Sequence, residues 1–293
     1  MPQLHYSLWY NKEAIQAVQT YTNLFPDSEL KAQTVLPDTP SGDVDYLLFR
    51  LGELQFSAMN GGGYSQLNES MSIMVMISSR EELNRIYETL SQGGKILMPL
   101  QSYDFCPYYV WFQDAYGLNW QLFLNEEQKT LYCFKLCLLF GREQNGLAES
   151  AMNFFIDELG ALEVARQYYP ENTVITAEGT KLVYGEVSYL NQKIAFMDHG
   201  AGGDAIFNTA FSLVLLCENQ AEIDSYWQLL SRVAEAEVCG WCQDDFGISW
   251  QIVPKSLEKA TFRATREEFK AMQAIYHPMK KLEIEPLATY LRD

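Results

Sequence analysis

Long apolar segments, basic clusters and histidine are scarce in this sequence of 293 residues. The most apolar stretch, 131–141, is roughly half as long as a membrane-spanning helix and contains Lys135. The first residues, MPQLHYSLWYNKEA, lack the basic segment and following apolar run that are typical of a signal peptide. We therefore expect a soluble, cytoplasmic protein that does not enter a membrane.

Acidic residues are more numerous than basic residues in this sequence. The sequence has 21 Lys and Arg residues against 38 Asp and Glu residues, which gives a formal net charge of −17 at pH 7. An acidic surface repels nucleic acids and anionic lipids, so neither is an expected partner. The six Cys residues are irregularly spaced, which predicts free thiols in a reducing compartment. A chain of this length predicts two domains of ordinary size.

The sequence contains an internal duplication. Segment 54–91 aligns without a gap with segment 194–231, and the identical pairs include Phe56 and Phe196, Gly62 and Gly202, Asn68 and Asn208, and Ser72 and Ser212. Further on, WFQDAYGLNWQ from Trp111 aligns with WCQDDFGISWQ from Trp241. The two copies are 140 positions apart in the first alignment and 130 positions apart in this one, a difference of ten residues. The first copy therefore has an insertion before Trp111 that the second copy lacks. Such a sustained register indicates a repeated unit of about 130 residues.

Each copy alternates helical and strand-like patterns. Segment 13–25 has apolar residues at helical spacing and ends at Pro26, whereas SLWY before it and LKAQTV, VDYLLFRL and LQFSAM after it are typical of strands. The same order returns around a second predicted helix at 81–90. The sequence therefore predicts a βαβββ module twice per copy, and four times in the chain. A doubly wound sheet would have a helix after every strand, so the expected class is α+β.

The second copy contains a Cys-x-x-Cys pair, Cys239 and Cys242, and Phe112 takes the place of Cys242 in the first copy. Residues three apart on a strand lie about 10 Å apart and point to opposite faces. A disulfide needs Cα atoms within about 7 Å. No second Cys pair or Cys/His pair at zinc spacing accompanies them. We therefore interpret both as strand residues rather than as a redox or metal site.

The repeated segments also resemble a known family. Tandem βαβββ units, LFPDSEL, GGG with NESMS, CGWCQDDFGISWQIVP and the closing HPMKKLEIEPLATYL are similar to the PhnB-like branch of the vicinal oxygen chelate superfamily (glyoxalase, bleomycin resistance and dioxygenase proteins). This branch is often labelled a 3-demethylubiquinone-9 3-methyltransferase domain. The resemblance implies two tandem domains with curled mixed sheets, at 1–128 and 129–258. It also implies a helical C-terminal tail at 259–293, which is expected to pack on the second domain.

Members of that superfamily can bind a divalent metal through one residue on each of four strands, usually His or Glu. By resemblance, the first copy offers His5, Gln55, Ser72 and Gln121, and the second offers Cys133 or Lys135, Ala195, Ser212 and Gln251. These sets hold at most one imidazole and no carboxylate, and neutral amides are poor ligands for a dication. We therefore expect no metal and no other cofactor. Methyl transfer is also not expected, because the Gly-rich segments 61–63 and 200–203 fall between predicted strands rather than before a helix.

Small-molecule binding is the function that the resemblance and the strand alternation favour. The ligand would be small and largely apolar, and the predicted binding residues are His5, Trp9, Gln55, Ser57, Ser72, Trp111, Asn119, Gln121, Ser212, Ser249 and Gln251. No catalytic residue is assigned. One alternative is a metal-dependent lyase, isomerase or dioxygenase that uses His5. The other is a structural module in which side chains fill the concave face of each curled sheet and leave no room for a ligand. The fused copies predict a monomer with paired domains or a homodimer.

Overall fold

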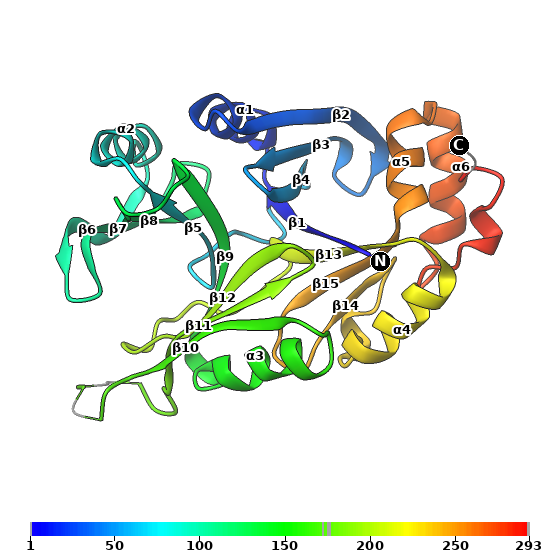
Figure 1. Ribbon diagram of the computed structural model, residues 1–293. Coiled ribbons are helices and arrows are strands. Elements are labelled where there is room, and N and C mark those ends of the chain that lie inside the picture. The colour runs from blue at the N-terminus through cyan, green and yellow to red at the C-terminus, as the bar shows by residue number, and fades with distance from the viewer. Residues whose placement is uncertain (1, 172, 175–176, 292–293) are drawn as a thin grey trace. The chain divides into compact units, whose positions relative to one another are not determined.

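The computed structural model describes residues 2–171, 173–174 and 177–291 and confirms the predicted α+β class (Figure 1). The chain forms two compact units. Unit 1 comprises Met1–Leu51, Gln55–Gln66 and Asn208–Asp293. Unit 2 comprises Gly52–Leu54 and Leu67–Phe207.

Unit 1 contains a seven-stranded mixed sheet with the strand order β14-β15-β13-β1-β4-β3-β2. Its elements are β1 (Gln3–Tyr10), α1 (Ala14–Leu24), β2 (Ser28–Thr39), β3 (Gly42–Leu51), β4 (Leu54–Asn60), β13 (Phe211–Cys217), α4 (Gln220–Leu230), β14 (Trp241–Gln243) and β15 (Ser249–Pro254). The first five come from the first repeat and the last four from the second. The sheet therefore joins the first module of the chain to the last.

Unit 2 contains an eight-stranded mixed sheet with the order β10-β11-β12-β9-β5-β8-β7-β6. Its elements are β5 (Met71–Ile77), α2 (Arg80–Leu90), β6 (Lys95–Tyr103), β7 (Cys106–Gln113), β8 (Asn119–Leu124), β9 (Tyr132–Phe140), α3 (Ala148–Asp157), β10 (Leu162–Tyr168), β11 (Leu182–Tyr189) and β12 (Gln192–Asp198). These are the two middle modules of the chain. The helices and strands predicted within the first repeat are all present.

The first strands of the modules hold each sheet together. β1 pairs antiparallel with β13, so that Ser7 lies opposite Ser212, and β5 pairs antiparallel with β9, so that Ser72 lies opposite Cys137. The predicted boundaries 1–128 and 129–258 follow the repeats of the sequence, whereas each compact unit takes one module from each repeat. The physical reason is that the first strand of a module presents unpaired backbone groups, which the first strand of another module satisfies.

The fourth module is shorter than predicted. After α4 it has a 3₁₀ turn (Ala234–Ala236) and two strands, so it is βαββ rather than βαβββ. The missing strand corresponds to the insertion that the second copy lacks. Cys239 lies in a turn with a φ of 50° and Cys242 lies in β14, so the prediction that both are strand residues is wrong for Cys239. The N–H groups of Cys239 and Gly240 donate to the carbonyls of Met279 and Lys280 at 2.8 and 2.7 Å, so the tail satisfies this backbone.

A buried carboxylate explains the repeated Asp-x-x-Gly and Trp. In the second repeat, Asp244 is 2% exposed and accepts hydrogen bonds from the N–H groups of Phe246 and Ile248 and from Trp250 Nε1, at 2.9, 2.9 and 2.8 Å. Asp114 makes the equivalent three bonds in the first repeat, including one of 2.8 Å from Trp120 Nε1. One side chain therefore fixes the turn and orients a fully buried indole in each repeat.

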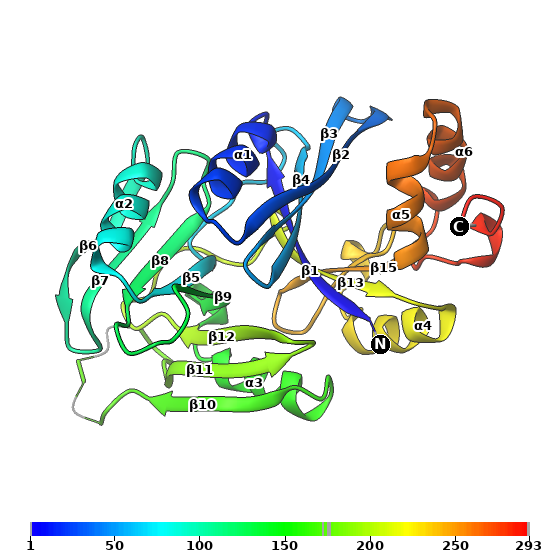
Figure 2. The ribbon, with the colours of Figure 1, turned by 45° about the horizontal axis from the view of Figure 1, so that its top comes forward.

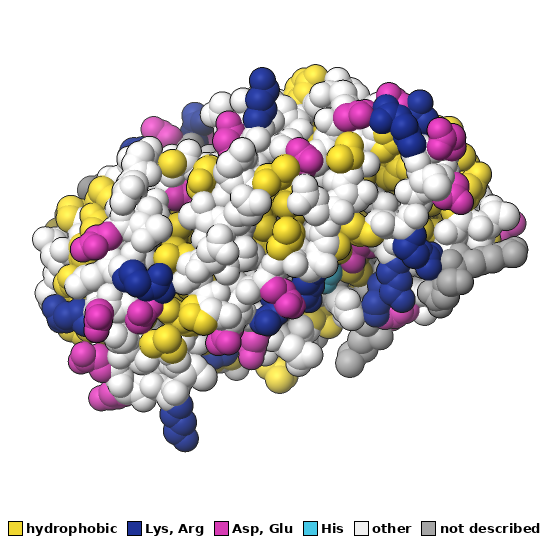
Figure 3. All heavy atoms as spheres, turned by 90° about the horizontal axis from the view of Figure 1, so that it is seen from above, with side chains coloured by type: hydrophobic (Ala, Val, Ile, Leu, Met, Phe, Trp, Pro, Cys, Tyr) yellow, Lys and Arg dark blue, Asp and Glu magenta, His cyan; other side chains and the backbone are white. Residues whose placement is uncertain are grey.

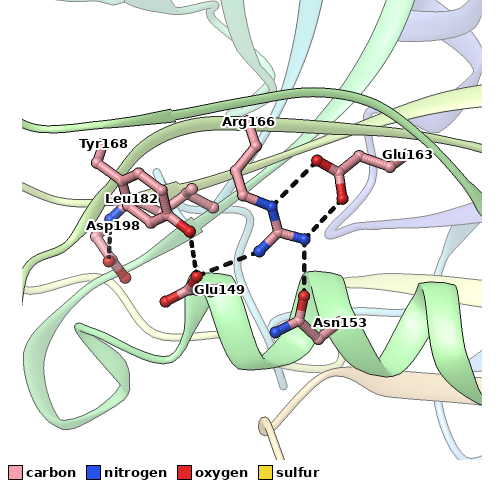
Figure 4. A network of polar contacts seen from close by, with 7 residues as sticks. All are labelled: Glu149, Asn153, Glu163, Arg166, Tyr168, Leu182 and Asp198. Carbon is pink, nitrogen blue, oxygen red and sulfur yellow. Dashed lines mark hydrogen bonds and ion pairs between the residues drawn. The ribbon is translucent and has the colours of Figure 1, made fainter.

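In unit 2, a polar network fastens the edge strand β10 to α3 (Figure 4). The guanidinium of Arg166 contacts Glu149 and Asn153 on α3 at 3.2 and 2.8 Å, and Glu163 on its own strand at 2.9 Å. Tyr168 donates to Glu149 as well. These bonds anchor a strand that has only one neighbour in the sheet.

The C-terminal tail is helical, as predicted, and belongs to unit 1. It consists of α5 (Lys255–Arg263), α6 (Arg266–Tyr276) with a capping box at Thr265, and a 3₁₀ turn (Glu285–Leu287). Both helices pack on β2, which comes from the first repeat, and α5 also packs on β13 and β15 (Figure 2). The tail therefore contacts strands of both repeats rather than the second alone.

None of the helices in the described part of the chain is long and apolar enough to span a membrane. On the face drawn in Figure 3, Lys and Arg side chains are interspersed with Asp and Glu side chains. This arrangement does not resemble the continuous basic surface that a nucleic acid requires.

Replacing Asp244 tests the importance of the buried carboxylate. We expect Asp244→Ala to lower the free energy of unfolding by about 2–4 kcal/mol, because an indole N–H and two backbone N–H groups lose their acceptor. Urea denaturation followed by circular dichroism measures this change. The neighbouring Asp245→Ala is the control, since the Asp245 side chain is 70% exposed. Equal losses in both variants would contradict the role assigned to Asp244.

Candidate functional site

The structure distributes the predicted binding residues over both units. Ser72, Trp111, Asn119 and Gln121 lie in unit 2. Unit 1 holds His5, Trp9, Gln55, Ser57, Ser212, Ser249 and Gln251. The predicted set His5, Gln55, Ser72 and Gln121 is therefore divided between two sheets. In its place, His5 and Gln55 share a sheet with Ser212 and Gln251.

Each sheet carries an equivalent amide–hydroxyl pair. Gln251 Nε2 donates to Ser212 Oγ at 2.9 Å in unit 1, and Gln121 Nε2 donates to Ser72 Oγ at 2.8 Å in unit 2. The hydroxyl of Tyr109 donates to Gln121 Oε1 at 2.7 Å, which holds the second amide in place. All the polar atoms of these pairs are uncharged.

A cavity of about 250 Å³ lies between the sheet of unit 1 and the C-terminal tail. The sheet contributes residues from each of its seven strands, among them Ser7, Tyr46, Met59, Val214, Trp241 and Gln251. The tail contributes the opposite wall with Leu257, Glu258, Thr261, Phe269, Gln273, Tyr276, His277 and Leu282. Most of these side chains are apolar or aromatic, which is typical of small-molecule sites.

Strand alternation places the cavity on the face of the sheet opposite α1 and α4, whereas the tail helices α5 and α6 form its other wall. Tyr6 and Phe56 lie on the covered face with their ring centroids 5.4 Å apart, and both are at most 1% exposed. Ser7, the next residue on β1, faces the cavity. Tyr46 reaches it from β3, hydrogen-bonds with Ser57 and stacks on Phe262 of α5 at a centroid distance of 5.3 Å.

Ion pairs fasten the tail over this cavity. The guanidinium of Arg266 contacts Asp43 at 2.8 Å and Asp38 at 3.0 Å, and Lys270 also pairs with Asp38. These four side chains are about half exposed, so each pair is screened by water and adds little stability by itself. Together they join α6 to the hairpin between β2 and β3.

Glu258 lines the cavity of unit 1 and is not among the residues that the sequence indicated. It lies on α5, its side chain is 13% exposed, and its Oε1 lies 3.5 Å from Nδ1 of His5, which is 12% exposed. The available sequence signal was the helical spacing of Leu257, Ala260 and Ala264 beside Glu258. That spacing predicts a buried helix face but does not indicate which surface it covers.

Several predicted residues have structural contacts instead of lining this cavity. Trp9 Nε1 donates to the carbonyl of Gly62 at 2.8 Å, and its ring packs so closely on Gly61 that a Cβ there would lie 2.1 Å from it. Gln55 accepts a hydrogen bond from Lys31. Ser249 is buried at 3% exposure. In unit 2, Asn119 is fully buried and its Nδ2 lies 3.4 Å from the carbonyl of Gly117.

The corresponding face of unit 2 is largely filled. Met74, Cys137 and Ala195 form a buried cluster, and four partly buried side chains pack on it: Met76, Phe123, Tyr184 and Met197. Burial raises the pKa of the Cys137 thiol to about 12, so it is protonated at neutral pH. Beside this cluster, Lys135 forms an ion pair with Glu186 and donates to the hydroxyl of Tyr184 at 3.1 Å. The Lys135 and Glu186 side chains are only 11% and 5% exposed.

A second cavity of about 480 Å³ lies within unit 2, next to Trp111. Its lining includes Glu69, Lys95, His199 and Asp204, so it is more strongly charged than the cavity of unit 1. The ring centroids of Trp111 and His199 are 6.2 Å apart. Burial lowers the pKa of His199 below its usual 6.5, so its imidazole is neutral at pH 7.

The sequence profile of the family described as 3-demethylubiquinone-9 3-methyltransferase matches residues 2–123 and again 133–253. The chain belongs to this family. The two matches confirm the tandem PhnB-like units of the vicinal oxygen chelate superfamily that the sequence indicated.

Solved structures from this superfamily are similar to the chain. A putative 3-demethylubiquinone-9 3-methyltransferase, the PhnB protein from Bacillus cereus, is 29% identical over 41% of this chain and 96% of its own, with a TM-score of 0.37. Glyoxalase I from Zea mays is 11% identical over 88% of this chain and 95% of its own, with a TM-score of 0.55, and shows the fold alone. No match was found among curated proteins.

Each unit has four positions that resemble the metal-ligand positions of the superfamily. The corresponding side chains in unit 1 are His5, Gln55, Ser212 and Gln251, and those in unit 2 are Ser72, Gln121, Ala195 and either Cys133 or Lys135. The Gln and Ser groups are neutral, and in each unit one Gln bonds to the Ser. The described residues contain no cluster of three or more His, Cys, Asp or Glu side chains suited to a metal. These donor sets do not fit a divalent cation.

The family name also does not fit the Gly-rich segments. Gly61 and Gly62 follow β4, and the chain continues into β5. Gly202 and Gly203 lie between β12 and β13 in the same way. A methyl donor normally binds where a Gly-rich turn opens a helix, and in both places the next element is a strand.

The buried pair in unit 2 makes a testable prediction. We expect Lys135→Met to lower the free energy of unfolding by about 3–5 kcal/mol, because the buried Glu186 would lose its cationic partner and keep only the hydrogen bond from Tyr184. The double variant with Glu186→Leu should recover most of this loss. Chemical denaturation of both single variants and the double variant measures the coupling. A purely additive double variant would contradict a direct interaction.

The stability of unit 2 should depend on the ionisation of His199. Its folded pKa lies below 6.5, so the neutral form stabilises the fold above pH 6.5 and this contribution is lost as the pH falls. We expect His199→Gln to reduce the loss of unfolding free energy between pH 7.5 and pH 5. Urea titrations of wild type and variant across this range provide the measurement. Parallel curves for the two proteins would show that His199 does not contribute.

Proposed function

We propose that the chain is a metal-free protein that binds a small, largely apolar molecule in the cavity of unit 1. The observation that carries this proposal is the cavity of about 250 Å³ between the sheet and the tail, with its predominantly apolar and aromatic walls. Ligand sites usually enclose about 300–1,000 Å³, so this cavity lies just below that range and would hold only a small molecule.

The polar groups of the cavity support recognition without a metal. Gln251 stands at the position that resembles a metal-ligand position of the superfamily, and it bonds to Ser212. Its amide and the nearby hydroxyl of Ser7 offer hydrogen bonds to a ligand while carrying no charge. Shape and apolar contact would supply most of the affinity, and these few polar groups would orient the ligand.

A metal-dependent lyase, isomerase or dioxygenase is the alternative function. One observation favours it: His5 and Glu258 lie 3.5 Å apart beside the cavity and could provide two of the ligands of a metal ion. Two donors fall short of the three or more protein ligands that such metals use. The binding protein is therefore the better supported proposal.

Metal analysis and ligand binding test the two functions. We expect far less than one equivalent of Mn, Fe, Ni or Zn in protein purified without chelators, measured by plasma mass spectrometry. The neutral probe 1-naphthylmethanol should bind wild type in isothermal titration calorimetry. The substitution Met59→Trp fills the cavity of unit 1 and should abolish this binding.

Met98→Trp in the cavity of unit 2 is the matched control and should leave the binding unchanged. A stoichiometric metal lost on replacing His5 would favour the enzyme. Binding that is sensitive to Met98→Trp alone would place the ligand in unit 2 and contradict the proposed site.

A further inference from the structure

The cavity of unit 1 has an unbalanced charge. Among the described residues that line it, Glu258 is the only one with a carboxylate, and the lining contains neither Lys nor Arg. The other polar side chains are hydroxyls, amides, a thiol and the imidazole of His277. A ligand that enters this space therefore meets one formal negative charge.

The carboxylate of Glu258 is poorly compensated by the protein. Its side chain is 13% exposed, and within the described part of the chain the ion pair found for it is with His5. The 3.5 Å separation is long for a charge-assisted hydrogen bond, and Nδ1 of His5 is buried without a hydrogen-bond partner. A buried carboxylate is costly unless a cation or several donors satisfy it. The site thus has an energetic reason to accept a cation.

Aromatic side chains surround the same space. Tyr46, Trp241, Phe269 and Tyr276 all line the cavity with Glu258. The charge of Glu258 also acts on the Tyr46 hydroxyl, whose pKa is raised first by burial and then by this carboxylate, so the two groups are neighbours. Aromatic faces attract organic cations and also contact apolar ligand atoms.

We infer that the ligand of unit 1 is an organic cation, namely a small apolar molecule that carries a protonated amine, and that Glu258 of α5 binds the amine. This inference rests on the proposed function and names the class of its ligand. It also makes the C-terminal tail a part of the binding site, because the tail supplies the charged group. An anionic ligand of the same shape is repelled by Glu258 and by the net charge of −17.

Three probes with one ring system and three charges test this inference. They are 1-naphthylmethylamine, a cation at pH 7.5, the neutral 1-naphthylmethanol and the anion 1-naphthoate, each titrated into the full chain by calorimetry. We expect the amine to bind about 10-fold tighter than the alcohol, as a desolvated charge-assisted contact would give, and the anion to bind most weakly.

The substitution Glu258→Gln keeps the size of the side chain and removes its charge. It should weaken amine binding to about the level of the alcohol, so that the preference for the amine is lost. Glu267→Gln, an exposed residue in the first turn of α6, is the matched control and should change none of the three affinities.

Each outcome separates the inference from the proposed function. Equal binding of amine and alcohol to wild type, or an equal loss of all probes in Glu258→Gln, would overturn the role of Glu258. If the inference fails in this way, but the alcohol binds to wild type and does not bind to Met59→Trp, the proposed function stands. Failure of all three probes to bind would overturn both.

Discussion

The pairing of module-initial strands determines how the rest of this protein is built. β1 and β13 share one continuous sheet, as do β5 and β9, and each pair brings together segments from the two repeats. The backbone groups of these strands would otherwise be exposed at a sheet edge. Each of the two sheets is therefore built from strands of both repeats. The duplication in the sequence and the division of the structure into two units are consequently different partitions of the chain.

The two sheets have an equivalent amide–hydroxyl pair but differ in the side chains that surround it. In unit 2, the side chains of Met74 and Cys137 and the buried pair of Lys135 with Glu186 fill the face of the sheet. In unit 1, the sheet leaves a space that α5 and α6 close from the other side. The difference arises from the neighbouring positions and from the tail. It explains why this face of the sheet is open in unit 1 and filled in unit 2.

Local features of this protein were readable from the sequence, and distant ones were not. Apolar spacing located α1 and α2, and the aligned segments from Trp111 and Trp241 contain the equivalent turns at Asp114 and Asp244. The sequence around β1 does not indicate that β13 is its partner, because the first strands of all four modules have similar apolar patterns. Glu258 was missed for the same reason: its helix reads as amphipathic, but the sheet that it covers is formed by strands far away in the chain. Gln251, which lines the cavity of unit 1, was predicted from the family resemblance of its motif.

The interleaved pairing also sets the order in which the protein can assemble during its synthesis. Ser72 and Cys137 lie opposite each other on β5 and β9, which belong to modules that follow one another in the chain. Ser7 and Ser212 lie opposite each other on β1 and β13, which belong to the first module and the last. At the usual pace of translation, β1 would wait roughly 10–40 s for β13 to leave the ribosome. Unit 2 can be complete before then. The first module must meanwhile keep an unpaired strand edge from associating with other chains.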